Sequence, residues 1–330
     1  MKNKTVASVF LTATIGLASA FSTQAAEYSL KLGVVTPTQH PHSLSALEFA
    51  KLVDEKTQGK VEVKVYDNGS LGSNPELLDG VQTGIIDMSV NTPGGLATYS
   101  SVTGILELPY LFSSKEHMMK VTRGPIGAEI SKTYLDDTGI EILGYFGGAQ
   151  RNMITKSKKI DSFDDLKGMK MRTWEWDVML NWWDSLGALG AVVAFPEVYT
   201  ALQTGVVDGA ENEFTTFTTA RWAEVGKYVA MTQHNITVRP LIVNAKKLAK
   251  LPVELQQAIR DAAKEAADFD VKLEGQLDEE NMAKLKADYG VVFTNPDKKP
   301  FIEASVKVIN DFAKQKNIET LAAKIINSAE

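Results

Sequence analysis

The stretch "PELLDGVQTGIIDMSVN" at residues 75–91 returns as "PEVYTALQTGVVDGAEN" at residues 196–212. The two copies share Pro, Glu, Gln, Thr, Gly, Asp and a final Asn at matching places. Each copy is typical of a helix that Pro opens and Gly ends, followed by a short strand. Because a β-rich segment also precedes each copy, the repeat predicts two similar α/β units.

The rest of the chain fits this interpretation. Alternating apolar residues predict strands at 28–35 and 61–66, a short apolar run predicts one at 192–195, and helical spacing predicts helices at 45–60 and 177–188. Residues 252–289 are rich in Ala, Glu, Lys and Leu and predict one long helix, which exceeds the length of a single unit. We therefore predict a two-lobed α/β fold in which each lobe is a mostly parallel sheet flanked by helices and the long helix spans both lobes.

The predicted boundaries divide the chain into a leader and two discontinuous lobes. Lobe I comprises residues 26–149 and 238–277, and lobe II comprises residues 150–237 and 278–330. Residues 1–25 combine a basic start with a short apolar run and small residues, which is typical of a cleaved signal peptide and predicts export to the periplasm. An uncleaved anchor is the alternative, although the run is short for a membrane span.

Composition excludes several classes of function. The chain contains no Cys, so neither disulfides nor thiol catalysis are available. Its formal net charge of −6, without a basic stripe, argues against nucleic-acid binding. No nucleophile-elbow, Walker or dinucleotide-binding motif is present. The pair His40-Pro41-His42 lacks a second cluster of ligand residues, so we predict no catalytic residues, no metal and no cofactor.

Two arginines and two asparagines are the candidate ligand contacts. Arg172 stands in "GMKMRTWEW" and Arg151 follows a Gly pair. A guanidinium meets a carboxylate with two parallel hydrogen bonds, so each could bind an acid, although each could equally pair with a surface carboxylate. Asn91 and Asn212 end the duplicated strands. Ligands bind outside the carboxyl ends of strands in open α/β sheets, so we expect these amides to meet at one cleft.

The whole mature sequence resembles the periplasmic solute-binding subunit of tripartite ATP-independent periplasmic (TRAP) transporters. The segments "HPHSLSALEFAKLVDEKTQGKVEVKVY", "DDLKGMKMR" and "FPEVYTALQTGVVDGAEN" carry the resemblance. It implies that Arg172 clamps a substrate carboxylate, that Arg151 assists and that Asn212 contacts the ligand. It also implies that Glu175 occupies a position that varies with substrate, and that the partners are TRAP permease subunits. Many members have Pro where this chain has Glu213. A monomer is expected.

The residues near the clamp suggest which acid is bound. An ionised Glu175 in the cleft would repel a second carboxylate and accept hydroxyl donors. Trp174 and Phe195 offer flat faces to a sugar ring, and Thr92 and His40 are expected on the other side of the cleft. We therefore predict a hydroxylated monocarboxylate, such as a uronate or aldonate. A zwitterion over Trp174, a C4-dicarboxylate, a 2-oxo acid, a ligand-sensing subunit for a receptor and an exported hydrolase remain the alternatives.

Overall fold

The computed structural model describes residues 26–329, so the predicted signal peptide lies outside the described residues. One sheet of nine strands forms the centre of the molecule, in the order β2-β1-β3-β8-β4-β7-β5-β6 with β9 beside β8. The strands are β1 (Tyr28–Gly33), β2 (Val61–Tyr66), β3 (Met88–Val90), β4 (Ile140–Thr155), β5 (Lys170–Thr173), β6 (Leu189–Val192), β7 (Gly209–Asn212), β8 (Tyr228–Asn244) and β9 (Val292–Thr294).

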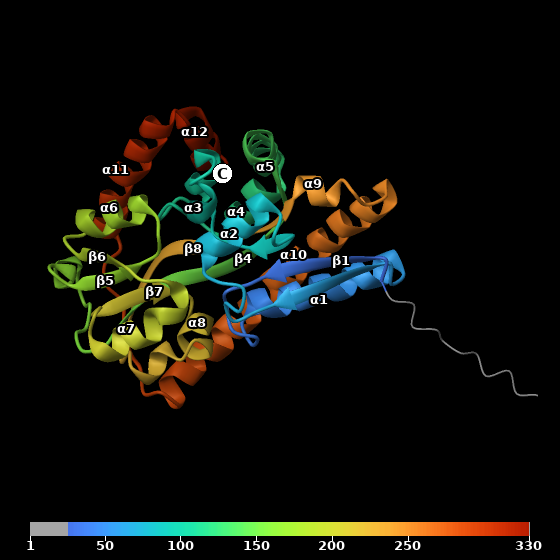
Figure 1. Ribbon diagram of the computed structural model, residues 1–330. Coiled ribbons are helices and arrows are strands. Elements are labelled where there is room, and N and C mark those ends of the chain that lie inside the picture. The colour runs from blue at the N-terminus through green and yellow to red at the C-terminus, as the bar shows by residue number, and fades with distance from the viewer. Residues whose placement is uncertain (1–25, 330) are drawn as a thin grey trace, which may run out of the picture.

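Helices cover both faces of this sheet (Figure 1). The α-helices are α1 (Pro41–Thr57), α2 (Asn74–Thr83), α3 (Pro93–Leu96), α4 (Lys115–Arg123), α5 (Pro125–Thr138), α6 (Asp177–Ser185), α7 (Val198–Thr204), α8 (Phe214–Thr219), α9 (Ala245–Leu248), α10 (Val253–Ala287), α11 (Lys299–Lys316) and α12 (Glu319–Asn327). Four short 3₁₀ helices are η1 (Ser101–Glu107), η2 (Phe163–Leu166), η3 (Phe195–Glu197) and η4 (Trp222–Glu224). Among residues 26–329, no helix combines the length and apolar character that crossing a membrane would need.

Two long strands join the halves of the sheet. At one end β1 pairs in parallel with β2 and β3, and at the other end β5 pairs in parallel with β6 and β7. Strands β4 and β8 lie between these parts (Figure 1), where they pair antiparallel with a register shift between Gly147 and Gln150. The predicted two-lobed α/β architecture is confirmed. The antiparallel pair that joins the parallel parts was not predicted, because its strands are far apart in sequence.

The duplicated stretch folds as expected. Helices α2 and α7 each end at a glycine in the left-handed region, Gly84 with φ 78° and Gly205 with φ 77°, which glycine adopts without a steric penalty. Strands β3 and β7 follow these helices. The strand predicted at 192–195 is wrong in its position. Strand β6 ends at Val192, and Phe195 already begins η3, because Pro196 cannot continue a hydrogen-bonded strand.

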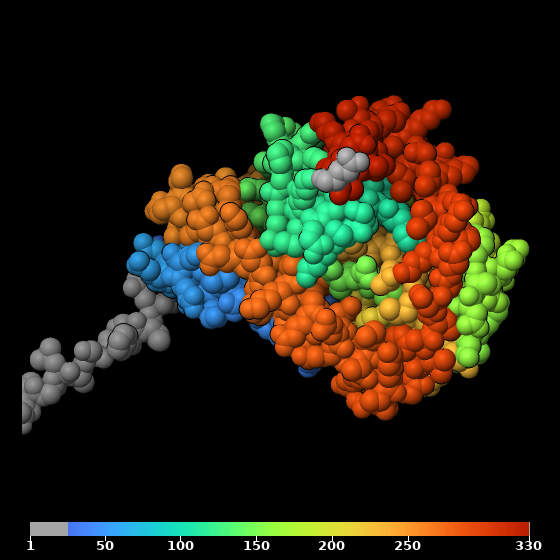
Figure 2. Space-filling view, turned by 180° about the vertical axis from the view of Figure 1, so that it is seen from behind, coloured from blue at the N-terminus to red at the C-terminus, as the bar shows by residue number. Residues whose placement is uncertain are grey.

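The long helix predicted over 252–289 is α10, and it runs across the back of the molecule (Figure 2). Its buried face places Ile259, Ala262, Ala263 and Ala266 at the spacing of a helical stripe. Alanine lets this face lie close to the sheet, and α10 packs against both α1 and β4. Toward its other end α10 packs against α8, and Leu285 joins the core cluster around Ala210 and Val229, so the helix contacts both parts of the molecule.

Candidate ligand-binding site

A cavity lies where strands β1, β3, β5 and β7 end. It encloses about 490 Å³, including some space open to solvent. The carboxyl ends of parallel strands meet at this edge, which is where ligands bind in open α/β sheets. The lining residues are Val34, Val35, Thr36, His42, Asn74, Val90, Thr92, Arg151, Arg172, Trp174, Phe195, Asn212, Glu213, Thr216 and Arg239.

Arg172 carries its charge into the cavity without a carboxylate partner. The side chain is buried on β5, and its Nε donates to the carbonyl of Val193 at 2.9 Å. Within the described chain no ion pair is formed by Arg172, and the guanidinium lies 5.9 Å from the centre of the Trp174 ring. Burial lowers the pKa of Arg172 to about 10, so the group is still charged at neutral pH. Its Nη atoms are suited to meeting an anion.

Arg151 also lines the cavity, but its charge is paired. Its Nε and Nη2 each lie 2.7 Å from an oxygen of Glu211, and His234 Nε2 lies 3.0 Å from the same carboxylate. Burial alone would lower the pKa of Arg151, but the charge and hydrogen bonds of Glu211 outweigh it and raise that pKa above its ordinary value. Because Glu211 already neutralises its charge, Arg151 is better suited to orienting neighbouring groups than to binding a charged ligand.

A third arginine was missed by the sequence analysis. Arg239 on β8 lines the cavity, and its Nη1 lies 3.3 Å from Glu107 Oε1. Glu107 is buried in turn and accepts the backbone N–H of Gly94 at 2.5 Å. The signal was present in the sequence, because Arg239 interrupts the apolar run "ITVRPLIV". A charge in such a run needs a buried partner or a functional reason.

Four other predicted residues also line the cavity, namely Trp174, Phe195, Asn212 and Thr92. Trp174 Nε1 is buried and has no hydrogen-bond partner among the described residues, so it is free to donate to a ligand. The sequence left open whether Trp174 or Trp176 faces the cleft. Trp174 does so, while Trp176 packs edge-on against Phe312, 5.8 Å between ring centres.

Glu175 does not line the cavity, and its predicted place there is wrong. Its side chain is exposed, in a separate surface depression beside Ala97 and Thr98. The physical reason is that β5 ends at Thr173 and the chain then turns, with the N–H of Trp176 donating to the carbonyl of Trp174 at 2.7 Å. The alternation of a strand therefore does not extend to position 175.

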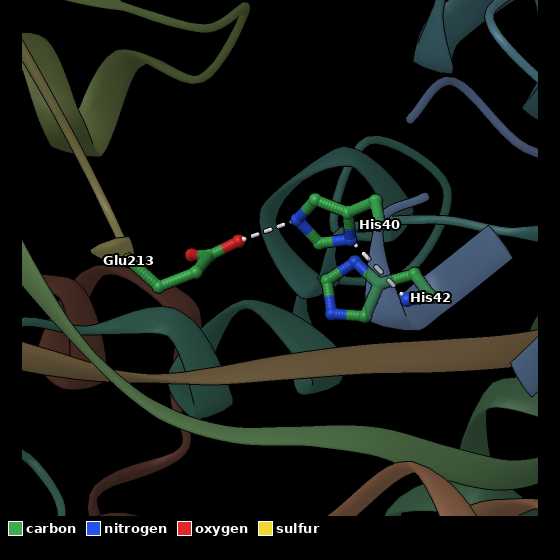
Figure 3. A group of neighbouring side chains, drawn as sticks. All are labelled: His40, His42 and Glu213. Carbon is green, nitrogen blue, oxygen red and sulfur yellow. Dashed lines mark hydrogen bonds and ion pairs between the residues drawn. The ribbon is translucent and has the colours of Figure 1, made fainter. Parts of the chain in front are cut away.

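Asn91 and His40 are also absent from the lining, which corrects two further predictions. The amide of Asn91 is used by its own loop, since Nδ2 donates to the carbonyl of Asn74 at 2.9 Å and Oδ1 accepts the N–H of Thr92 at 2.8 Å. His40 is fully buried behind the cavity wall, where its Nε2 lies 3.1 Å from Glu213 Oε1 (Figure 3). Only one of the two duplicated asparagines, Asn212, therefore reaches the cavity.

Two buried groups hold ligand-type atoms within 4.8 Å of one another, namely His40, His42 and Glu213, and His42, Asp270 and Glu274. In the first group, His40 Nε2 lies 3.1 Å from Glu213 Oε1, while the ring of His42 forms no hydrogen bond to either residue. In the second, His42 Nε2 lies 2.8 Å from Glu274 Oε1, a close electrostatic contact whose angles do not satisfy a hydrogen bond. Burial is the main cause that raises the pKa of Asp270 and of Glu274 to about 7.

The pair Asp270 and Glu274 also holds the bend in β4. Asp270 Oδ2 accepts the N–H of Gly147 at 2.6 Å, and Glu274 Oε2 accepts the N–H of Ala149 at 2.7 Å. Gly147 has φ 120°, which L side chains rarely adopt, and a Cβ there would lie 2.0 Å from the carbonyl oxygen of Thr237. Helix α10 thus supports the irregular segment where β4 passes between the two parts of the sheet.

Comparison with known proteins identifies the family. The model of bacterial extracellular solute-binding protein, family 7 (DctP), matches residues 32–316. The chain belongs to this family. Members of the DctP family bind solutes, and this agrees with a cavity that presents an arginine without a protein anion and with the architecture predicted from the duplicated stretch.

Several relatives of this DctP-family chain are known. A TRAP periplasmic solute-binding protein from Sulfitobacter sp. NAS-14.1, solved with bound β-D-galacturonate, is 31% identical with a TM-score of 0.87, covering 91% of this chain and 99% of that chain. One from Roseobacter denitrificans OCh 114, solved with L-galactonate, is 30% identical with a TM-score of 0.85, covering 90% and 99%. The 2,3-diketo-L-gulonate-binding periplasmic protein YiaO of Escherichia coli is 29% identical over 296 residues, 90% of each chain.

Proposed function

We propose that this protein captures a hydroxylated monocarboxylate, a uronate or an aldonate, in the periplasm and delivers it to a TRAP membrane permease. The observation that carries the proposal is Arg172, a buried cation that lines the cavity without a protein carboxylate beside it. A ligand carboxylate would supply the missing anion through two parallel hydrogen bonds. The sugar acids bound by the structural neighbours support the same class of ligand.

The other lining groups suit the rest of such a ligand. Asn212, Thr92 and Thr216 offer amide and hydroxyl groups for sugar hydroxyls, and the Trp174 ring offers an apolar face. Asn212 Oδ1 accepts the N–H of Glu213 at 3.2 Å, which fixes the amide and directs its Nδ2 as the remaining donor. The protein does not convert its ligand chemically, and the bound acid is released unchanged.

Capture proceeds by closure of two lobes. The predicted boundaries at 149/150 and 237/238 fall close to the register shift between Gly147 and Gln150 in the β4–β8 pair, and the third, at 277/278, lies within α10. The C-terminal helices contact both parts, because α11 packs on α6 and α12 reaches α4 through the 2.9 Å contact from His117 Nε2 to the carbonyl of Ile325. A ligand that contacts both lobes favours the closed state.

Calorimetry on the mature protein tests the proposal. The panel comprises D-galacturonate, D-glucuronate and L-galactonate, with succinate and pyruvate as acids that lack a polyhydroxyl chain. We expect micromolar or tighter binding of at least one sugar acid, with succinate and pyruvate at least about tenfold weaker. The ligand recovered after binding should have an unchanged mass. A protein that binds none of the sugar acids, or that converts one to a product, would contradict the proposed function.

A further inference from the structure

Glu213 is the single carboxylate among the residues that line the described cavity. It directly follows Asn212 at the end of β7, and its side chain is 2% exposed. Its Oε1 accepts from Thr216 Oγ1 at 2.7 Å, and its Oε2 lies 3.1 Å from Thr237 Oγ1 and 3.5 Å from Arg151 Nη1. The carboxylate is therefore held in place by partners from three elements.

His40 gives this carboxylate one further donor. His40 Nδ1 accepts the backbone N–H of His42 at 3.2 Å, so Nδ1 is unprotonated and the ring proton lies on Nε2. Nε2 faces Glu213 Oε1, as Figure 3 shows. Burial lowers the pKa of His40, so a neutral ring donates this hydrogen bond. The wall behind the cavity is thus arranged to stabilise an ionised carboxylate without adding a positive charge.

Arginine and glutamate side chains are mixed around the cavity, and burial raises the pKa of one of these carboxyls, that of Glu107. Three guanidinium groups line it, those of Arg151, Arg172 and Arg239, and three carboxylates lie among them, those of Glu107, Glu211 and Glu213. Burial alone would raise the pKa of Glu213, but the His40 hydrogen bond and the Arg151 charge hold it well below its usual range. Asp270 and Glu274 lie behind His42, outside the lining.

We propose that Glu213 sets the ligand charge that the cavity accepts, favouring acids with one carboxylate over otherwise similar acids with two. One ligand carboxylate can pair with Arg172, which forms no ion pair among the described residues, although the charges of Glu211 and Glu175 act on it. A second would have to be buried in the same cavity as the fixed Glu213 anion, and an uncompensated buried charge is costly. This inference rests on the proposed function, since it concerns the same cavity and the same class of ligand.

Matched pairs of ligands test the inference. Galactarate is the diacid counterpart of both D-galacturonate and L-galactonate, and glucarate is the counterpart of D-glucuronate. The ratio of the diacid Kd to the monoacid Kd is measured by calorimetry for the wild type and for Glu213→Gln. Glu175→Gln is the control, because it removes an exposed carboxylate that does not line the cavity.

We expect the ratio of diacid Kd to monoacid Kd to be at least about ten in the wild type. In Glu213→Gln this ratio should be at least about fivefold smaller, and in the control it should stay within about twofold of the wild-type ratio. If Glu213→Gln does not fold, Glu213→Met replaces it, because it is an uncharged side chain of similar length and keeps the backbone N–H that Asn212 Oδ1 accepts. Parallel weakening of both ligands in the folded variant would overturn the inference, as would a wild type that binds the diacid equally well. A wild type that binds neither monoacid would instead reject the proposed function.

Discussion

Arg151 and Glu211 form a two-point ion pair in the interior, with the Nε and Nη2 atoms of Arg151 each 2.7 Å from one oxygen of the Glu211 carboxylate. Arg172 lines the same cavity, and its Nε bonds only to the carbonyl of Val193. The sequence predicts the same role, contact with a carboxylate, for both arginines. Their partners in the structure give them different roles. Arg151 is compensated by the protein, whereas Arg172 is left for a ligand.

Replacement of Arg172 should therefore weaken binding more than folding. Arg172→Lys keeps the charge but loses the planar pair of donors that matches a carboxylate. We expect sugar-acid affinity to fall at least about tenfold, or about 1.4 kcal/mol, with a melting temperature of the ligand-free protein close to that of wild type. Calorimetry and thermal unfolding measure the two effects separately. Wild-type affinity in a folded Arg172→Lys protein would reject the carboxylate clamp.

Replacement of Glu211 should, in contrast, weaken folding more than binding. Glu211→Ala leaves the buried Arg151 without its main partner, which typically costs about 3–5 kcal/mol. The control is Glu129→Ala, which breaks the exposed pair with Lys324 and should cost less than about 1 kcal/mol. Urea unfolding of the ligand-free proteins measures both values. Equal losses in the two variants would show that the interior pair adds little to stability.

Ligand binding should make the molecule more compact. The cavity is lined from several elements on both sides of the β4–β8 pair, so a ligand that contacts both sides favours closure. We expect a smaller radius of gyration by small-angle X-ray scattering at saturating ligand. Arg172→Lys at a ligand concentration below its own Kd should keep the ligand-free radius. An unchanged radius in a saturated wild-type sample would contradict two-lobe closure.

Asp270 should make stability depend on pH. Burial, followed by the charge of Glu274, raises its pKa from 3.8 to about 7 in the folded protein. The folded state therefore holds this proton more tightly than the unfolded chain, and the associated stability is present below about pH 4 and lost as the pH rises toward 7. Asp270→Asn removes this titration, so its melting temperature relative to wild type should increase by at least about 2 °C from pH 4.5 to pH 8.

The matched control for this pH effect is Asp261→Asn, an exposed aspartate on the same helix. Its melting temperature relative to wild type should stay constant across the same range. His40, His42 and His234 also titrate with lowered pKa values, because burial disfavours their charged forms. The charge of Asp270 raises the pKa of His42, so the difference reports the titration of Asp270 together with its effect on His42. A constant difference for Asp270→Asn would contradict its raised pKa.

The sequence by itself determined the repeated α/β units, the long helix and six of the residues that line the cavity. These features follow from local physics, since glycine stops, proline starts and apolar periodicity act within a few residues of chain. Arg172, Asn212 and Trp174 lie near or just after the ends of strands, which fix where a cleft forms, whereas Arg151 lies inside β4 and was suggested by the Gly pair before it and by the family resemblance. Their contacts with a ligand remain predictions.

Only the tertiary structure decided which charges are free. Glu175 and Glu213 both follow a strand that ends at the cavity, yet a turn after Trp174 exposes the first, while three packed elements enclose the second. The pairing of Arg151 with Glu211, 60 residues further along the chain, likewise leaves Arg172 unpaired. Such choices depend on distances between segments remote in sequence, and Coulomb energy and desolvation depend on those distances rather than on order along the chain.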